Sequence, residues 1–208
     1  HSLRYHINLD KQISKQDGIW RHDTMVPNLA RDRTIGLLGL GALGSACALK
    51  LRELNFNVQG WSRTKKKIPN IECLSGDKGF DKVLKTSDIL ILLLPLTDKT
   101  KYILNSKTLA KVKKGIFIIN AGRGSLIDDE ALISFIDKGT VAAATLDVFS
   151  KEPLPSSHIF WAHAKVTVTP HIAAETRPQT SSKSIAENIF RSENGLGLLN
   201  LVDRVEGY

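Results

Sequence analysis

Three glycines, Gly39, Gly41 and Gly44, form a G-x-G-x-x-G string that follows the apolar run Thr34–Leu38 and opens an amphipathic segment. In that context the string predicts a turn that binds a dinucleotide, which a glycine motif alone would not. Gly39 would permit the tight turn, Gly41 would let a pyrophosphate approach the backbone, and Gly44 would let helix and strand pack closely. The first turn of the helix would then offer free N–H groups to the phosphates. A glycine-rich turn without a ligand is the alternative.

The end of the next apolar segment indicates which dinucleotide is bound. A site for NAD(H) has an Asp or Glu about 20 residues beyond the glycines, which accepts a hydrogen bond from the ribose 2′-hydroxyl. The run Val58–Lys65 contains no acid. Arg63 could hold a 2′-phosphate through its guanidinium, and Ser62 could donate a hydrogen bond to it. We therefore predict NADP(H) as the preferred cofactor, with NAD(H) possible; otherwise Arg63 and the nearby lysines only face water.

Four more side chains that could take part in binding or proton transfer follow shortly after three further predicted strands. They are Arg123, Asp147, Glu152 and His171. Ligands of open α/β sheets bind at the carboxyl ends of the strands. We therefore expect an arginine, a carboxylate and a histidine to converge over the nicotinamide ring. Taken alone, a histidine that follows a proline is more often an ordinary loop residue.

With these residues the sequence resembles the D-isomer-specific 2-hydroxyacid dehydrogenase family, and within it the glyoxylate/hydroxypyruvate reductases of the bacterial A type. The separations agree with that family: 29 residues from Arg123 to Glu152, and 19 from Glu152 to His171. The run Trp61–Thr64 is similar to that subgroup, whose members favour NADPH. The resemblance covers nearly the whole chain, up to Asn200–Tyr208.

The resemblance implies that hydride from NADPH reduces glyoxylate or hydroxypyruvate to the 2-hydroxy acid. His171 would protonate the ketone oxygen, Glu152 would bind its other ring nitrogen, and Arg123 would hold the substrate carboxylate. Asp147 would orient the nicotinamide carboxamide, unless it binds local backbone at the strand end. Leu94–Pro95 would pass under the cofactor, unless it is an ordinary strand exit. Motif and resemblance together give the predicted cofactor-binding residues as Gly39, Gly41, Ala42, Leu43, Gly44, Ser62, Arg63, Leu94, Pro95, Ala121, Arg123, Asp147 and His171. No metal site is predicted.

Two other functions stay open. One is an NAD-dependent dehydrogenase of another D-2-hydroxy acid, which cofactor preference would separate from the first. The other is a nucleotide-sensing member without catalysis, since some relatives of the family act as transcriptional corepressors. The complete set of Arg123, Glu152 and His171 argues against a sensor.

Composition excludes several classes of protein. With 42% hydrophobic and 24% charged residues among 208, the chain has the make-up of a globular domain. No apolar run approaches the roughly 18 residues of a membrane span, and the polar start is unlike a signal peptide. Two cysteines give no disulfide framework, so we expect a cytoplasmic protein. The net charge is +8, but the basic residues are scattered and aromatics are only 6%, so nucleic acid is not an expected partner.

Apolar runs alternate with amphipathic ones, a pattern typical of a Rossmann-like, doubly wound parallel α/β sheet. The predicted strands are Thr34–Leu38, Asn57–Trp61, Ile89–Leu94, Ile116–Asn120, Val141–Leu146 and Val166–Thr169. The predicted helices are Leu43–Leu54, Ser106–Lys111, Asp128–Lys138 and Pro178–Asn194, with one more at the start from the spacing of Leu3, Ile7, Leu9 and Ile13. We divide the chain into an interdomain helix and loop (1–30), an NAD(P)-binding domain (31–177) and a C-terminal helix and tail (178–208).

Members of the family carry a substrate domain ahead of the cofactor domain, on the order of a hundred residues, a normal size for a small domain. This sequence lacks it. We therefore expect residues 178–208 to lack the domain on which they would pack, and the 208-residue chain to bind NADPH but turn over slowly. The resemblance further implies that the longer parent protein is an active homodimer.

Overall fold

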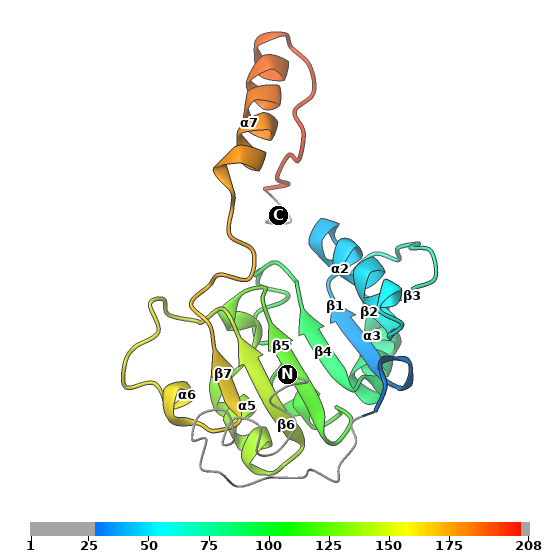
Figure 1. Cartoon of the computed structure of the whole chain (residues 1–208), viewed down its shortest axis with the longest axis vertical. Coiled ribbons are helices and arrows are strands. Elements are labelled where there is room, and N and C mark those ends of the chain that lie inside the picture. Colours follow the sequence, from blue (N-terminus) through cyan, green and yellow to red (C-terminus); the bar gives the residue numbers. More distant parts are fainter. Residues whose placement is uncertain (1–27, 205–208) are drawn as a thin grey trace, which may run out of the picture.

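The computed structural model describes residues 28–204, so residues 1–27, with the predicted opening helix, and 205–208 lie outside the described part. Its centre is a seven-stranded sheet in which every pair of neighbours is parallel. The strand order is β3-β2-β1-β4-β5-β6-β7 (Figure 1). The strands are β1 (Thr34–Leu38), β2 (Asn57–Trp61), β3 (Glu72–Leu74), β4 (Ile89–Leu92), β5 (Ile116–Asn120), β6 (Val141–Leu146) and β7 (Val166–Val168). The predicted α/β fold class is confirmed.

Helices connect most successive strands. They are α2 (Ala42–Glu53), α3 (Gly76–Thr86), α4 (Ser106–Leu109), α5 (Asp129–Asp137), α6 (Ile159–Ala162) and α7 (Pro178–Glu193), with short 3₁₀ turns η1 (Ala30–Asp32) and η2 (Gly124–Leu126). Because β-α-β crossovers are right-handed, α2 and α3, which lead in opposite directions along the sheet, cover opposite faces. None of the helices in the described part is long and apolar enough to cross a membrane.

The apolar core forms two layers, one on each face of the sheet. Ile35, Leu37 and Ile91 pack with Ala48 of α2 on one side. On the other side lies the larger cluster, which joins the alternate residues of the same strands to α3 and α5. Its fully buried members include Leu38, Val83, Leu84, Leu90, Leu92, Ile116, Ile118, Leu132 and Ile136. Burial of both faces explains why the strands read as continuous apolar runs rather than alternating ones.

The structure contains three elements that the sequence patterns did not predict: β3, α3 and α6. Helix α3 is rich in charge and contains two glycines, which lowers intrinsic helix propensity. Its buried Val83 and Leu84 nevertheless anchor it in the larger core cluster. Tertiary packing therefore stabilises a helix that local propensity disfavours.

Several predicted boundaries shift by one or two residues. Strand β4 ends at Leu92 instead of Leu94, and the chain then leaves the sheet toward Pro95, which has no N–H to donate. Asp128 lies outside α5 as its N-cap, where its carboxylate accepts a hydrogen bond from the backbone N–H of Ala131 at 3.1 Å. Asp128 was predicted as the first residue of the helix, but it precedes the helix and caps its N-terminus.

Two features of the arrangement matter for function. The strand order reverses between β1 and β4, which makes a topological switch point, the usual ligand crevice of such sheets. Helix α7 and the chain that follows it extend away from the sheet (Figure 1), and α7 has no buried residue.

Candidate active site

The turn between β1 and α2 has the geometry that the glycine motif predicts. Gly39 has φ +108°, and a Cβ there would lie 2.7 Å from the carbonyl oxygen of Leu93. A Cβ at Gly44 would lie 1.9 Å from the carbonyl oxygen of Gly39, so helix and turn are in contact. Around Gly41, by contrast, nothing lies within 4 Å of the place of a Cβ. Gly41 is the N-cap of α2 and provides no side-chain cap, which leaves the N–H groups of the first turn available to an anion.

A cleft of about 690 Å³ opens beside this turn, at the switch point between β1 and β4. Its walls contain six of the predicted cofactor residues, namely Gly39, Gly41, Ser62, Arg63, Leu94 and Pro95. The predicted residues that do not line it are Ala42, Leu43, Gly44, Ala121, Arg123, Asp147 and His171. The wall residues that were not among the predicted cofactor-binding residues are Leu40, Trp61, Thr64, Lys66, Leu96, Thr97, Asp98, Lys99 and Thr100. The basic run Lys65–Lys67 was the signal for Lys66.

The two side chains predicted to hold a 2′-phosphate differ in their surroundings. Arg63 is exposed at the mouth of the cleft, next to Lys66 in its lining. Ser62 is buried, and its hydroxyl donates to the carbonyl of Thr64 at 2.8 Å. Donation from Ser62 to a phosphate would require this hydrogen bond to break.

Arg123 stands beyond β5 on a loop that packs closely against its neighbours. A Cβ at Gly122 would lie 3.0 Å from the carbonyl oxygen of Leu94, and one at Gly124 only 1.9 Å from the carbonyl carbon of Phe149. The loop therefore joins the cleft wall on one side to the segment after β6 on the other. Buried Asn120 closes the loop, since its amide donates to the carbonyl of Arg123 and its Oδ1 accepts from the N–H of Gly122. The exposed Arg123 guanidinium donates to the carbonyl of Gly122 at 2.7 Å.

The two residues predicted to form an acid–base pair lie in hydrogen-bond contact. Nδ1 of His171, on the loop after β7, lies 2.8 Å from Oε2 of Glu152. The other oxygen, Oε1, accepts a hydrogen bond from the N–H of Phe149 at 2.8 Å. These hydrogen bonds, the one to His171 foremost, lower the pKa of Glu152, with the charge of Arg123 adding to the effect. A carboxylate only accepts, so Nδ1 carries the shared proton and Nε2 is left for the reaction.

Asp147 points its carboxylate at the loop that carries His171. Oδ1 accepts from the hydroxyl of Thr169 at 2.5 Å and from the N–H of Ile172 at 3.0 Å, and Oδ2 accepts from the N–H of Ala173 at 2.9 Å. Burial opposes its ionisation, but these hydrogen bonds outweigh burial and leave the pKa of Asp147 below its ordinary value. These bonds agree with the second interpretation of Asp147 given above, in which it binds local groups at the end of the strand.

The comparisons agree with this geometry. The family model described as D-isomer specific 2-hydroxyacid dehydrogenase, NAD binding domain, matches residues 1–173. The chain belongs to this family. It is 41% identical over 207 residues to a glyoxylate/hydroxypyruvate reductase A of Yersinia enterocolitica. It is 42% identical over 206 residues to a glyoxylate/hydroxypyruvate reductase A of Photorhabdus laumondii. Each alignment covers 99% of the chain but 66% of the relative, so the chain spans just under two thirds of these curated proteins.

Solved members of the family have the same fold. A D-isomer specific 2-hydroxyacid dehydrogenase from Xanthobacter autotrophicus Py2, in complex with NADPH and MES, superposes with a TM-score of 0.91 at 39% identity, covering 100% of the chain and 85% of that structure. An NADPH-dependent glyoxylate/hydroxypyruvate reductase from Sinorhizobium meliloti, in complex with NADP and sulfate, gives 0.92 at 36% identity, covering 100% and 66%.

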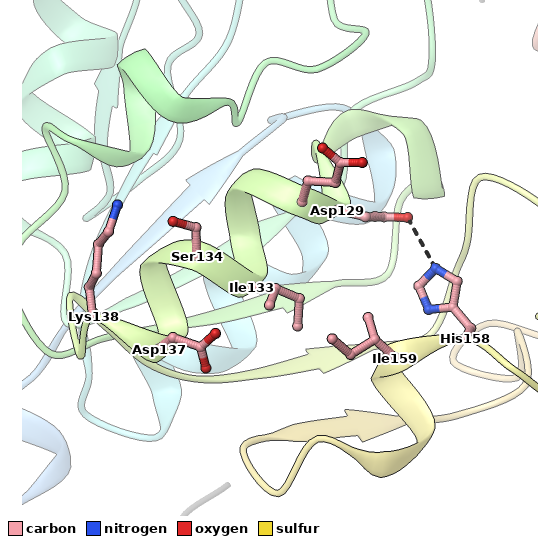
Figure 2. A pocket seen from close by; sticks show the side chains of 8 residues that line it. Asp129, Ile133, Ser134, Asp137, Lys138, His158 and Ile159 are labelled. Atoms are coloured by element: carbon pink, nitrogen blue, oxygen red, sulfur yellow. Dashed lines mark ion pairs between the residues drawn. The ribbon is translucent and has the colours of Figure 1, made fainter.

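Elsewhere this dehydrogenase-family chain has a second cavity, of about 600 Å³, between α5 and α6. Figure 2 shows the ion pair at one end of it, where His158 Nε2 lies 3.7 Å from Asp129 Oδ2. Burial raises the pKa of Asp129, although His158 opposes this. His158 also caps α6 through Nδ1, and His163 bonds Asp137 at 3.2 Å, so both histidines have structural partners. Within residues 28–204 no three His, Cys, Asp or Glu side chains gather as metal ligands would.

Proposed function

We propose that this chain is the cofactor-binding and proton-transfer part of a reductase that converts glyoxylate or hydroxypyruvate to the 2-hydroxy acid with NADPH. The observation that carries the proposal is the 2.8 Å pair of His171 and Glu152 beside Arg123, at the same sheet edge as the glycine turn. The curated relatives named glyoxylate/hydroxypyruvate reductase A support the substrate class. Because those proteins are longer, the activity belongs to the whole protein rather than to these residues alone.

The cleft fits a phosphorylated dinucleotide. Open space at Gly41 and uncapped N–H groups at the start of α2 suit a pyrophosphate. Arg63 and Lys66 at the cleft supply positive charge, and no acid closes β2 to repel a 2′-phosphate. Related structures that contain NADPH or NADP support the same preference. NAD(H) binding without the 2′-phosphate contact is the weaker alternative.

The reaction needs three actions from the chain's own residues. When bound, NADPH supplies the hydride that reduces the carbonyl carbon of the 2-oxoacid. Arg123 would hold the substrate carboxylate through its guanidinium. His171 would give its Nε2 proton to the carbonyl oxygen as that oxygen becomes a hydroxyl. Glu152 would keep the imidazole in orientation through Nδ1 and stabilise its protonated form before transfer.

The apolar surface of α7 supports the proposed domain division. Ile185, Ile189 and Phe190 are more than half exposed, and Leu201 in the following chain is 72% exposed. Side chains of this kind are usually buried against another element. We propose that residues 178–208 pack on the substrate domain present in the longer relatives, and that the complete protein is a cytoplasmic homodimer.

The test uses the protein at the length of its curated relatives, with NADPH oxidation followed in the presence of glyoxylate or hydroxypyruvate. His171→Ala should lower kcat by about 100- to 10,000-fold, the usual effect of losing a general acid. The Kd for NADPH should not change. His163→Ala is the matched control, because His163 pairs with a carboxylate far from the cleft residues. Full activity of the His171 variant would refute the proposed role of His171 as proton donor, whereas NADPH binding without any turnover by the wild type would favour a nucleotide sensor.

A further inference from the structure

The loop that carries the proton donor has an unfavourable backbone conformation. His171 has φ +55°, in the left-handed region that residues with a Cβ seldom adopt. Such a conformation persists only where the surrounding structure holds it in place. His171 and the residues that follow it are exposed, so apolar packing is not what holds the loop.

The loop is held instead by hydrogen bonds that it donates to one residue, Asp147. The carbonyl oxygen of Asp147 accepts from the N–H of His171 at 2.8 Å. Its carboxylate accepts from Thr169 on one side of the histidine and from Ile172 and Ala173 on the other. Asp147 thus binds the loop at four points, one of them His171 itself and the others within two residues of it. With 5% of its surface exposed, Asp147 has little competition from water for these bonds.

The backbone of Asp147 is fixed to the sheet, and the chain continues from it to Glu152. Its N–H donates to the carbonyl of Asn120 at the end of β5, at 2.9 Å. The chain then runs through Phe149, whose N–H binds Glu152. Asp147 is therefore the point from which both His171 and Glu152 are positioned relative to Arg123.

We infer that Asp147 is a positioning residue, whose carboxylate holds the His171 loop so that Nδ1 meets Glu152. This inference rests on the proposed role of His171 as the proton donor. The positioning role is additional to the contact with the nicotinamide carboxamide that family resemblance implies for Asp147. The distinguishing consequence is that the carboxylate matters before any cofactor is bound.

The experiment therefore uses the 208-residue chain without cofactor. Long-range proton–nitrogen spectra of the imidazoles are recorded for the wild type and for Asp147→Asn, Thr169→Val, Glu152→Gln and Asp137→Asn. Asp147→Asn keeps one acceptor oxygen but loses the other and the charge, so it should weaken the nitrogen shifts of a hydrogen-bonded Nδ1–H at His171 and move the spectrum toward that of Glu152→Gln. Thr169→Val, which removes one bond and no charge, should cause a smaller change in the same direction. Asp137→Asn should alter His163 and leave His171 as in the wild type.

A second measurement separates the two roles of Asp147. Titration with NADPH reports the contact with the cofactor, whereas the spectrum recorded without cofactor reports the positioning of His171. A His171 spectrum unchanged by Asp147→Asn would overturn the inference, and weaker NADPH binding in that case would assign Asp147 to cofactor contact alone. Backbone amide spectra report whether each variant is folded, and Thr169→Val keeps the test decisive should Asp147→Asn unfold. Failure of the wild type to bind NADPH would instead contradict the proposed function, without affecting the comparison of imidazole spectra.

Discussion

Glu152 and His171 are 19 residues apart in the chain, yet their side chains meet at 2.8 Å. Glu152 is supplied by the segment after β6 and His171 by the loop after β7, and these strands are parallel neighbours. Their carboxyl ends therefore lie at the same edge of the sheet. Because Glu152 also binds the N–H of Phe149, it meets the imidazole from a fixed position. The pair is a direct product of the sheet topology.

The first prediction concerns cofactor choice. Replacing Arg63 or Lys66 with Ala should raise the Kd for NADPH by about tenfold or more, since a hydrogen bond to a charged group contributes about 1.5–3 kcal/mol. The Kd for NADH should not change. Fluorescence titration of the 208-residue chain measures both constants. Lys65→Ala is the control, because Lys65 adjoins the same run without lining the cleft. Equal losses for NADH and NADPH would show that these side chains do not recognise the 2′-phosphate.

The second prediction separates two glycines of one motif. Gly44→Ala places a Cβ against the backbone carbonyl of Gly39, which cannot withdraw, so the variant should lose about 3 kcal/mol of stability, at the upper end of the overpacking cost. Gly41→Ala has open space and a negative φ, so its free energy of unfolding should change by less than about 1 kcal/mol. It should nonetheless weaken NADPH binding, because the methyl group occupies the place of the pyrophosphate. Urea unfolding and NADPH titration check the pair, and a Gly41 variant with normal affinity would contradict this assignment.

The third prediction concerns acid. The pKa values of Asp147 and Glu152 are lowered in the folded chain, whereas in the unfolded chain such groups titrate near about 4. Their contribution to the free energy of unfolding is therefore complete above that pH, and it is lost as the pH falls through the folded values. The free energy of unfolding, measured with urea, should drop between about pH 5 and pH 3, the range that brackets the ordinary carboxyl pKa. Asp147→Asn should make this drop shallower. Asp129, whose pKa is raised, acts with the opposite sign, so Asp129→Asn should steepen it.

The fourth prediction concerns the apolar surface of α7. In the 208-residue chain, Phe190→Ser should change stability by no more than about 0.5 kcal/mol, because the ring is 55% exposed. Leu132→Ala, in the core on α5, should cost about 2–5 kcal/mol. In a protein of the relatives' full length, Phe190→Ser should also become destabilising. A Phe190 variant that is neutral at both lengths would contradict the packing of residues 178–208 on a further domain.

The fifth prediction concerns turnover. The 208-residue chain should bind NADPH with the affinity of the longer protein, since the cleft is formed entirely by residues of the described part. Its kcat for glyoxylate should be far lower, because the family resemblance implies that the substrate domain of the longer protein supplies half of the substrate pocket and excludes water from it. Steady-state assays on both lengths measure the difference. Equal turnover would show that the cofactor domain suffices.

Much of the fold was predictable because its signals are local. Six of the seven strands were found, with β4 predicted too long by two residues at Leu94 and β7 by one. The first strand, Thr34–Leu38, was predicted correctly to the residue, together with the glycine turn that follows it. Helix α3 and strand β3 were missed because Val83 and Leu84 stabilise that region through contacts with distant strands. Lys66 was missed as a cleft residue because the sequence does not show which lysine of three faces the cleft.

The sequence by itself determined the class of fold, the family, and the identity of the groups that can do chemistry: a glycine turn, a guanidinium, a carboxylate and an imidazole. These depend on residue type and spacing, which are local properties of a chain. Only the tertiary structure decided which groups meet. It turned Asp147 toward the loop of His171 and committed the hydroxyl of Ser62 to Thr64, because hydrogen-bond partners are chosen by distances that arise when separate strands are brought to one edge.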